Sequence, residues 1–170
     1  TDRSLEGNRE ADFKLDTPLQ ETIDYAWTAL RAGWGFYLTR SNVNDPYGTR
    51  RSREFMEDFL LKFGYHPQRQ QANVTTETGS SHAISFLCPD AGQMPVIVKG
   101  DRTGDTEADR LERCSLDYRS KGNRREKSAH ATMLEYLNNT ENIYGIIANG
   151  PTLRLIRNSG QLVKLTYIEF

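Results

Sequence analysis

The sequence has few cysteines, no long apolar run and no excess of basic residues. Its two cysteines, Cys88 and Cys114, lie far apart and form no C-x-x-C pair, so neither a zinc knuckle nor a disulfide framework is predicted. No apolar run approaches the roughly 20 residues of a membrane-spanning helix, and the polar start lacks the apolar stretch of a signal peptide. We therefore expect a cytoplasmic protein that has no membrane partner.

The charge balance limits which partners the whole surface can attract. The 170 residues include 22 Lys and Arg and 23 Asp and Glu, which gives a formal net charge of −1. A protein with this balance has no general basic field for nucleic acid, so any DNA-binding surface must be local. We predict a polar lead-in over residues 1–16 and a single domain over residues 17–170, long enough to bury one core.

Hydrophobic spacing predicts an α/β fold in which helices flank a mixed β-sheet. Capping and turn residues place helices from Thr17 to Gly33, from the arginines near residue 50 to Gly64, and from Ser128 to about Asn138. Residues 101–127 are dense in charges of both signs, and we predict an exposed insertion there. Strands are predicted in residues 82–88, 95–100, 143–148, 153–157 and 162–170, with a hairpin turn at Asn149-Gly150.

The strongest candidate for catalysis combines Pro89-Asp90 with Ile97-Val98-Lys99. Metal-dependent nucleases of the PD-(D/E)xK type carry an Asp at the head of one strand and acid-x-Lys on the next. Two carboxylates then hold Mg²⁺ while the lysine stabilises the attacked phosphate. We therefore predict Asp90 and Lys99 as the catalytic pair, with Asp90 as the metal ligand, and expect their side chains to face one another across adjacent strands.

The middle acid of this pattern is missing, because Ile97 takes its place and cannot bind a hard cation. The site is therefore expected to be degenerate unless a carboxylate from elsewhere completes it. Glu57, Asp58 and Asp101 are the candidates for that role. The other interpretation is a turn aspartate and a strand-end lysine without any joint role. The three histidines, His66, His82 and His130, have no metal-ligand spacing, and each is predicted to pack or to form hydrogen bonds.

Basic residues at the start of the second helix are the candidates for phosphate contacts. Arg50, Arg51 and Arg53 lie in its first turn, where the helix dipole disfavours cations. Arginines beside free helix-start amides form an anion site, so we predict that these three bind DNA phosphates. The alternative is a solvated face on which they pair with acidic residues of the same helix. Arg124 and Arg125, before the third helix, are predicted to contribute as well.

The last 43 residues of the chain, 128–170, resemble a known family. "SAHATMLEYLNNTENIYGIIANGPTLRLIRNS" followed by "YIEF" is similar to the N-terminal region of large Eco57I-like restriction-modification and phage-defence adenine methylases. Leu134 departs from the pattern, because the family has a helix glutamine there. The matching residues are Ser128, His130, Glu135, Leu137, Asn138, Gly145, Asn149, Gly150, Leu153, Arg154, Leu155, Arg157, Ser159, Tyr167, Glu169 and Phe170.

The resemblance implies a PD-(D/E)xK-like domain that precedes an adenine methyltransferase, so we expect this chain to be part of a larger protein. The parent protein would use S-adenosylmethionine, whereas this domain would hold no cofactor other than Mg²⁺ at Asp90. Three functions follow. The first is a degenerate domain that engages DNA, the second is an active Mg²⁺-dependent endonuclease, and the third is a docking module for the methyltransferase or for a defence-complex subunit.

Overall fold

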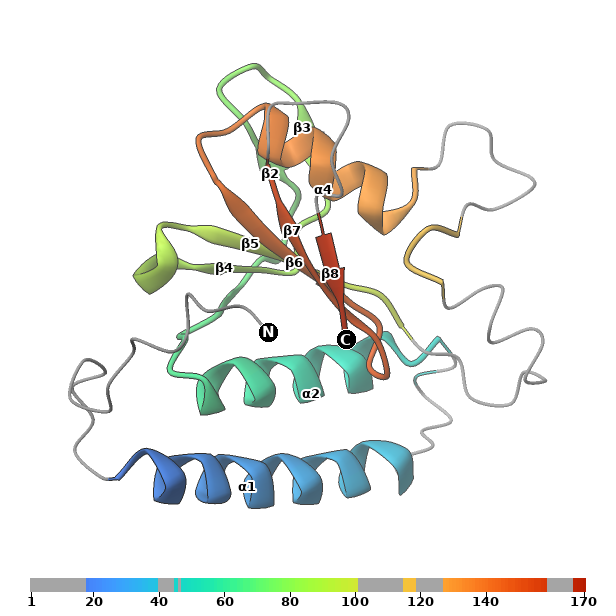
Figure 1. Cartoon of the computed structure of the whole chain (residues 1–170). Coiled ribbons are helices and arrows are strands. Elements are labelled where there is room, and N and C mark those ends of the chain that lie inside the picture. Colours follow the sequence, from blue (N-terminus) through green and yellow to red (C-terminus); the bar gives the residue numbers. More distant parts are fainter. Residues whose placement is uncertain (1–17, 40–44, 46, 101–114, 119–126, 159–166) are drawn as a thin grey trace.

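The structure is a computed structural model that describes residues 18–39, 45, 47–100, 115–118, 127–158 and 167–170. Helices cover both faces of a β-sheet (Figure 1). The helices are α1 (Leu19–Thr39), α2 (Thr49–Lys62) and α4 (Ala129–Asn138), with a 3₁₀ turn at Pro89–Ala91. The strands are β1 (Gln68–Arg69), β2 (Val74–Thr75), β3 (Ser81–His82), β4 (Phe86–Cys88), β5 (Met94–Val98), β6 (Tyr144–Ala148), β7 (Leu153–Arg157) and β8 (Tyr167–Glu169).

The main sheet has the strand order β1-β4-β5-β6-β7-β8. Its neighbours are antiparallel except β5 and β6, which run parallel. Parallel neighbours cannot be joined by a tight turn, and α4 supplies the crossover between them. β2 and β3 form a separate two-stranded sheet. The structure thus confirms the predicted mixed sheet flanked by helices.

Two hydrophobic clusters hold the helices to opposite faces of the sheet. All five residues of β5 are buried, as expected for a strand that is covered on both faces. Because successive strand side chains alternate, Val96 and Val98 pack toward α2 while Ile97 packs toward α4. Met56 and Leu60 on α2 belong to the first cluster, and Met133 and Leu137 on α4 belong to the second.

Local signals placed two of the three helices well. Ser128 caps α4 as predicted, because its hydroxyl accepts a hydrogen bond from the Ala131 amide at 3.1 Å. The predicted end of the first helix at Gly33 is wrong, since α1 continues to Thr39. A glycine inside a helix costs only about 1 kcal/mol. Packing of Trp34 and Tyr37 against Phe55 of α2 favours the longer helix.

The two N-terminal helices form a layer of their own below the sheet. α2 packs on the sheet and α1 packs on the far side of α2 (Figure 1). Several large apolar side chains of α1 are therefore exposed, including Tyr25, Trp27 and Phe36. Within the described residues, none of the helices is both long and apolar enough to cross a membrane.

Candidate functional site

The structure does not bring the predicted catalytic pair together. Asp90 lies in the 3₁₀ turn that precedes β5, and Lys99 directly follows the other end of that strand. At about 3.3 Å per residue, the five residues of β5 alone separate them by about 16 Å. The expectation that the two side chains face one another is therefore wrong. Asp90 stands at the tail of β4, whereas the nuclease pattern requires an acid at the head of the strand.

Asp90 instead forms a local contact with His66. Its carboxylate accepts the His66 backbone N–H at 3.1 Å and lies 3.2 Å from the ring nitrogen Nδ1. Desolvation raises the pKa of Asp90, but the hydrogen bonds from His66 outweigh it and hold the pKa below its usual value. A single exposed carboxylate offers too few oxygen ligands for Mg²⁺. Among the described residues, no group of three or more His, Cys, Asp or Glu is arranged to hold a metal ion.

Apolar side chains fill the place where the nuclease pattern requires the metal-holding acids. Ile97 is 7% exposed and packs with Ile84 and Leu116 in the cluster under α4. At the head of β4, Ser85 is buried and its hydroxyl accepts the Val98 amide at 2.9 Å. The proposed replacement Glu57 is paired with Arg69. Neither Ile97 nor Ser85 supplies a carboxylate, so these two positions do not fit Mg²⁺.

The three arginines of α2 have different environments. Arg50 is exposed and pairs with Glu54 at 2.9 Å. Arg51 is buried, with its guanidinium carbon 4.4 Å from the centre of the Tyr37 ring. Arg53 is half-buried, and its Nε atom is enclosed without a hydrogen-bond partner. The prediction for Arg51 is therefore corrected, because this side chain packs between α1 and α2 and does not face solvent.

The start of α2 lies against the end of β5. The Asp45 carboxylate accepts the Arg51 amide at 2.9 Å, so the chain itself supplies an anionic group at this helix start. A β-carbon at Gly100 would overlap the Tyr47 carbonyl oxygen and lie 2.8 Å from the Thr49 amide nitrogen. This close approach places Arg50 and Lys99 at one end of the molecule. Arg124 and Arg125 lie outside the described residues, as does Asp101.

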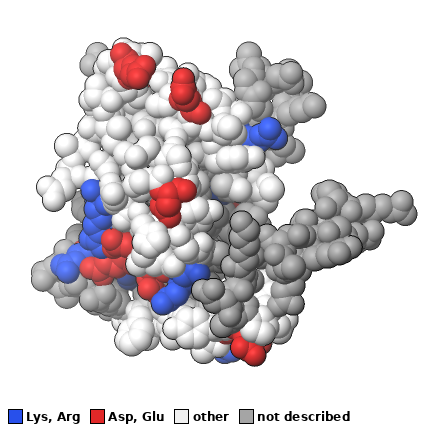
Figure 2. Space-filling view, turned by 90° about the vertical axis from the view of Figure 1, so that its left-hand side faces the viewer, with Lys and Arg blue, Asp and Glu red and all other residues white. Residues whose placement is uncertain are grey.

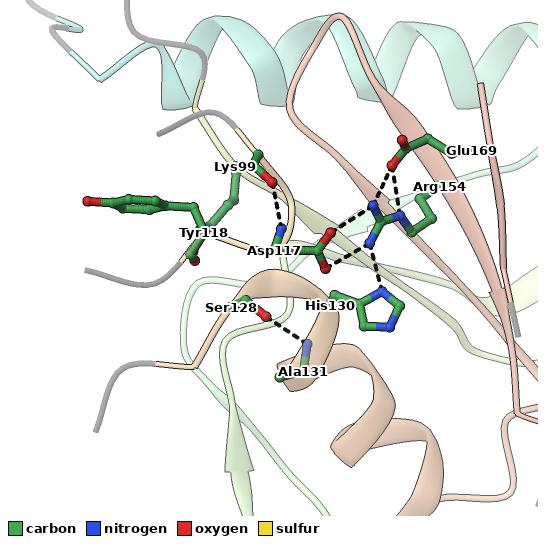
Figure 3. A network of polar contacts seen from close by, with 9 residues as sticks. Lys99, Asp117, Tyr118, Ser128, His130, Ala131, Arg154 and Glu169 are labelled. Atoms are coloured by element: carbon green, nitrogen blue, oxygen red, sulfur yellow. Dashed lines mark hydrogen bonds and ion pairs between the residues drawn. The ribbon is translucent and has the colours of Figure 1, made fainter. Parts of the chain in front are cut away.

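A polar cluster that was not predicted from the sequence lies at the same end of the sheet (Figure 3). At its centre is Arg154 of β7, whose side chain is 5% exposed. Its Nη1 and Nη2 atoms each donate to the Asp117 carboxylate at 3.0 Å. Its Nε and Nη2 atoms donate to Glu169 of β8 at 2.8 and 2.5 Å. His130, near the start of α4, approaches Nη1 with its Nδ1 atom at 2.9 Å.

Charge and burial fix the protonation states in this cluster. The hydrogen bonds from Arg154 lower the pKa of Asp117, against the opposing effect of its partial burial. Burial and the nearby Arg154 charge lower the pKa of His130, so the ring is neutral at pH 7 and its Nδ1 can accept from the guanidinium. Burial opposes the charged form of Arg154, but the two carboxylates outweigh it and raise the pKa of Arg154.

The cluster connects segments that are remote in the sequence. Asp117 comes from residues 115–118, inside the region predicted to be an exposed insertion. That prediction is wrong for Leu116, which is 2% exposed in the core and whose carbonyl accepts the His130 amide at 3.2 Å. The rest of the insertion, residues 101–114 and 119–126, lies outside the described residues. Lys99 joins the cluster through its Nζ atom, 3.4 Å from the Tyr118 carbonyl.

The resemblance in residues 128–170 contains a sequence signal for this cluster. His130, Arg154 and Glu169 all belong to the residues that match the family pattern, and the structure places the three around one guanidinium. The pattern assigns no role to these residues, so it does not by itself predict a site. Nothing in the sequence singles out Asp117 among the many charged residues near it.

The surface charge agrees with the small net charge. On the side of the molecule seen in Figure 2, the Lys and Arg side chains of the described residues lie among Asp and Glu side chains, and these residues form no broad area of either sign. Comparison of the chain with protein family models, curated proteins and solved structures found no match.

Proposed function

We propose that this chain is a catalytically degenerate, PD-(D/E)xK-like domain that engages DNA in a restriction-modification or phage-defence adenine methyltransferase. One observation carries the proposal: β4 and β5 form an adjacent strand pair in a mixed sheet, and Lys99 keeps its place after β5 although buried Ile97 replaces the middle acid. The resemblance in residues 128–170 supports the same family. S-adenosylmethionine would belong to the methyltransferase domain of the parent protein.

Cleavage by this domain is not favoured. A metal-dependent nuclease would need carboxylates near Lys99, and the two described carboxylates in the cluster there, Asp117 and Glu169, both bind Arg154. A guanidinium that donates hydrogen bonds to both carboxylates neutralises the charge that would attract Mg²⁺. We propose instead that Lys99 and Arg50 contact phosphates of the DNA backbone, which positions the domain without reading the sequence.

DNA affinity is expected to fall as the salt concentration rises. Each phosphate contact contributes a slope of about −0.9 to log K against log salt. Replacing Lys99 or Arg50 by alanine should lower the affinity for DNA and make the salt slope shallower by about 0.9. Fluorescence anisotropy with a labelled duplex, between about 50 and 200 mM salt, measures both quantities.

Lys62→Ala provides the matched control, since Lys62 lies in the last turn of α2, far from the end of β5. This variant should bind DNA as the wild-type protein does. Affinity that does not depend on salt, or an equal loss in Lys62→Ala and Lys99→Ala, would contradict DNA binding at this end of the molecule.

A docking function is the second candidate, because an apolar groove of about 660 Å³ lies between α2 and strands β6 and β7. Phe59 of α2 and Phe63, which directly follows α2, line one side, and Leu153 and Leu155 of β7 line the other. Phe170, which is 73% exposed, also lines it. Apolar surfaces of this kind mark sites of protein–protein contact, so we propose the methyltransferase domain of the parent protein as its occupant.

Replacing Phe63 by aspartate should weaken docking of the methyltransferase domain about tenfold or more, because buried aromatic anchors dominate interface energies. Phe63 is 58% exposed, so the chain itself should remain folded. Calorimetric titration of the two separately produced domains measures the change. Tyr25→Asp on α1 is the control, since Tyr25 is 73% exposed and lies outside the groove. Equal binding by both variants would exclude the groove as the docking surface.

A further inference from the structure

We infer that the Asp117 carboxylate occupies an anion site built around Arg154, and that a phosphate group of the nucleic-acid backbone takes this place when Asp117 turns away. The inference rests on the proposed DNA-binding function and deepens it. It assigns a binding site that includes Arg154 and Lys99, with Asp117 as an internal competitor of the ligand.

The arginine is held so that one edge of its guanidinium is available for exchange. Glu169 accepts from Nε and Nη2 on one side, and the Tyr167 ring lies 4.2 Å from the guanidinium carbon. On the other side, Nη1 and Nη2 donate in parallel to the two oxygens of Asp117, both at 3.0 Å. A two-pronged contact of this kind is also how arginine binds phosphate.

A second cation lies near the same carboxylate. The Lys99 Nζ atom is 3.4 Å from the carbonyl oxygen of Tyr118, the residue after Asp117, and its charge adds to that of Arg154 in lowering the pKa of Asp117. With Asp117 turned away, Glu169 would still bind the Arg154 guanidinium on one side, and the Nη1 and Nη2 atoms would face the vacated position on the other. The positive charge of Arg154 favours an anion at that position. Lys99 also lies at the end of the molecule that carries Arg50, so the site is continuous with the proposed DNA contacts.

The Asp117 side chain can rotate away from Arg154 without unfolding of the segment that carries it. Its side chain is 56% exposed, although the guanidinium it binds is almost completely buried. The neighbouring Leu116 anchors the segment through its buried side chain and through its carbonyl, which accepts the His130 amide. A rotation of the Asp117 side chain into solvent would release the Nη1 and Nη2 atoms of Arg154 from their hydrogen bonds to it.

Asp117→Asn tests the inference, because it removes the charge and retains the shape of the side chain. We expect the affinity for a labelled DNA duplex to rise about threefold to tenfold, with a salt slope steeper by about 0.9. Adding Lys99→Ala should remove much of that gain. Glu141→Gln is the control, since it makes the same change in net charge at an exposed residue just before β6. Asp117→Ser provides a second uncharged variant if the asparagine variant proves unstable.

The outcomes separate this inference from the proposed function. If the wild-type chain binds DNA in a salt-dependent manner and neither uncharged variant binds more tightly than Glu141→Gln, this inference fails and DNA binding stands. Absence of salt-dependent binding by wild type and variants alike overturns both. If the uncharged Asp117 variants bind inorganic phosphate more tightly by calorimetry but do not bind DNA more tightly, the assignment to nucleic acid is overturned.

Discussion

Arg154→Leu is expected to destabilise the protein by about 3 kcal/mol, at the lower end of the about 3–5 kcal/mol measured when one partner of a buried ion pair is removed. The substitution leaves Asp117 and Glu169 without their shared partner. Both carboxylates are about half exposed, at 56% and 44%, so water compensates part of the loss. The free energy of unfolding of Arg154→Lys should lie between those of the wild-type protein and Arg154→Leu, because one ammonium cannot satisfy both carboxylates in parallel.

Urea unfolding measures this effect, and an unchanged m-value would show that the change lies in stability and not in the unfolded state. Arg50→Ala is the matched control. Arg50 is 71% exposed and has one helical pair with Glu54, so its loss should change the free energy of unfolding by less than about 1 kcal/mol. If Arg154→Leu changes the free energy of unfolding as little as Arg50→Ala does, the cluster around Arg154 does not stabilise the fold.

Gly100→Ala should also destabilise the protein, toward the upper end of the about 1–3 kcal/mol that overpacking typically costs. The added β-carbon would overlap the Tyr47 carbonyl oxygen and approach the Thr49 amide. These are backbone atoms, so no side-chain rotation can relieve the overlap, and α2 must shift away from the end of β5. Thermal and urea unfolding would both detect the change.

Gly35→Ala is the control for that substitution, because nothing lies within 4 Å of the position that its β-carbon would take. Since Gly35 is inside α1, the alanine should stabilise the protein by about 0.5–1 kcal/mol. Opposite signs for the two variants would support the close contact between α2 and β5. Equal stability of Gly100→Ala and wild type would mean that this contact does not form.

Local patterns predicted most of the elements but fewer of their contacts. The Ser128 cap and the Asn149-Gly150 hairpin act within a few residues, so they could be recognised from the sequence, and Gly150 indeed has a φ of 98°. Arg51 could not be predicted as buried, because its environment depends on Tyr37 from another helix. The adjacent strands β4 and β5 were predicted correctly, but Asp90 lies in the turn between them and Lys99 follows β5 at its opposite end.

The sequence by itself determined that the chain forms a mixed sheet with flanking helices, since hydrophobic periodicity, caps and turns depend on neighbouring residues. Only the tertiary structure decided which polar groups meet. Asp117 and Arg154 are 37 residues apart, and they form an ion pair because Leu116 packs under α4 while β7 pairs with β6. Such contacts depend on how whole elements pack together, and no local pattern in the chain specifies that.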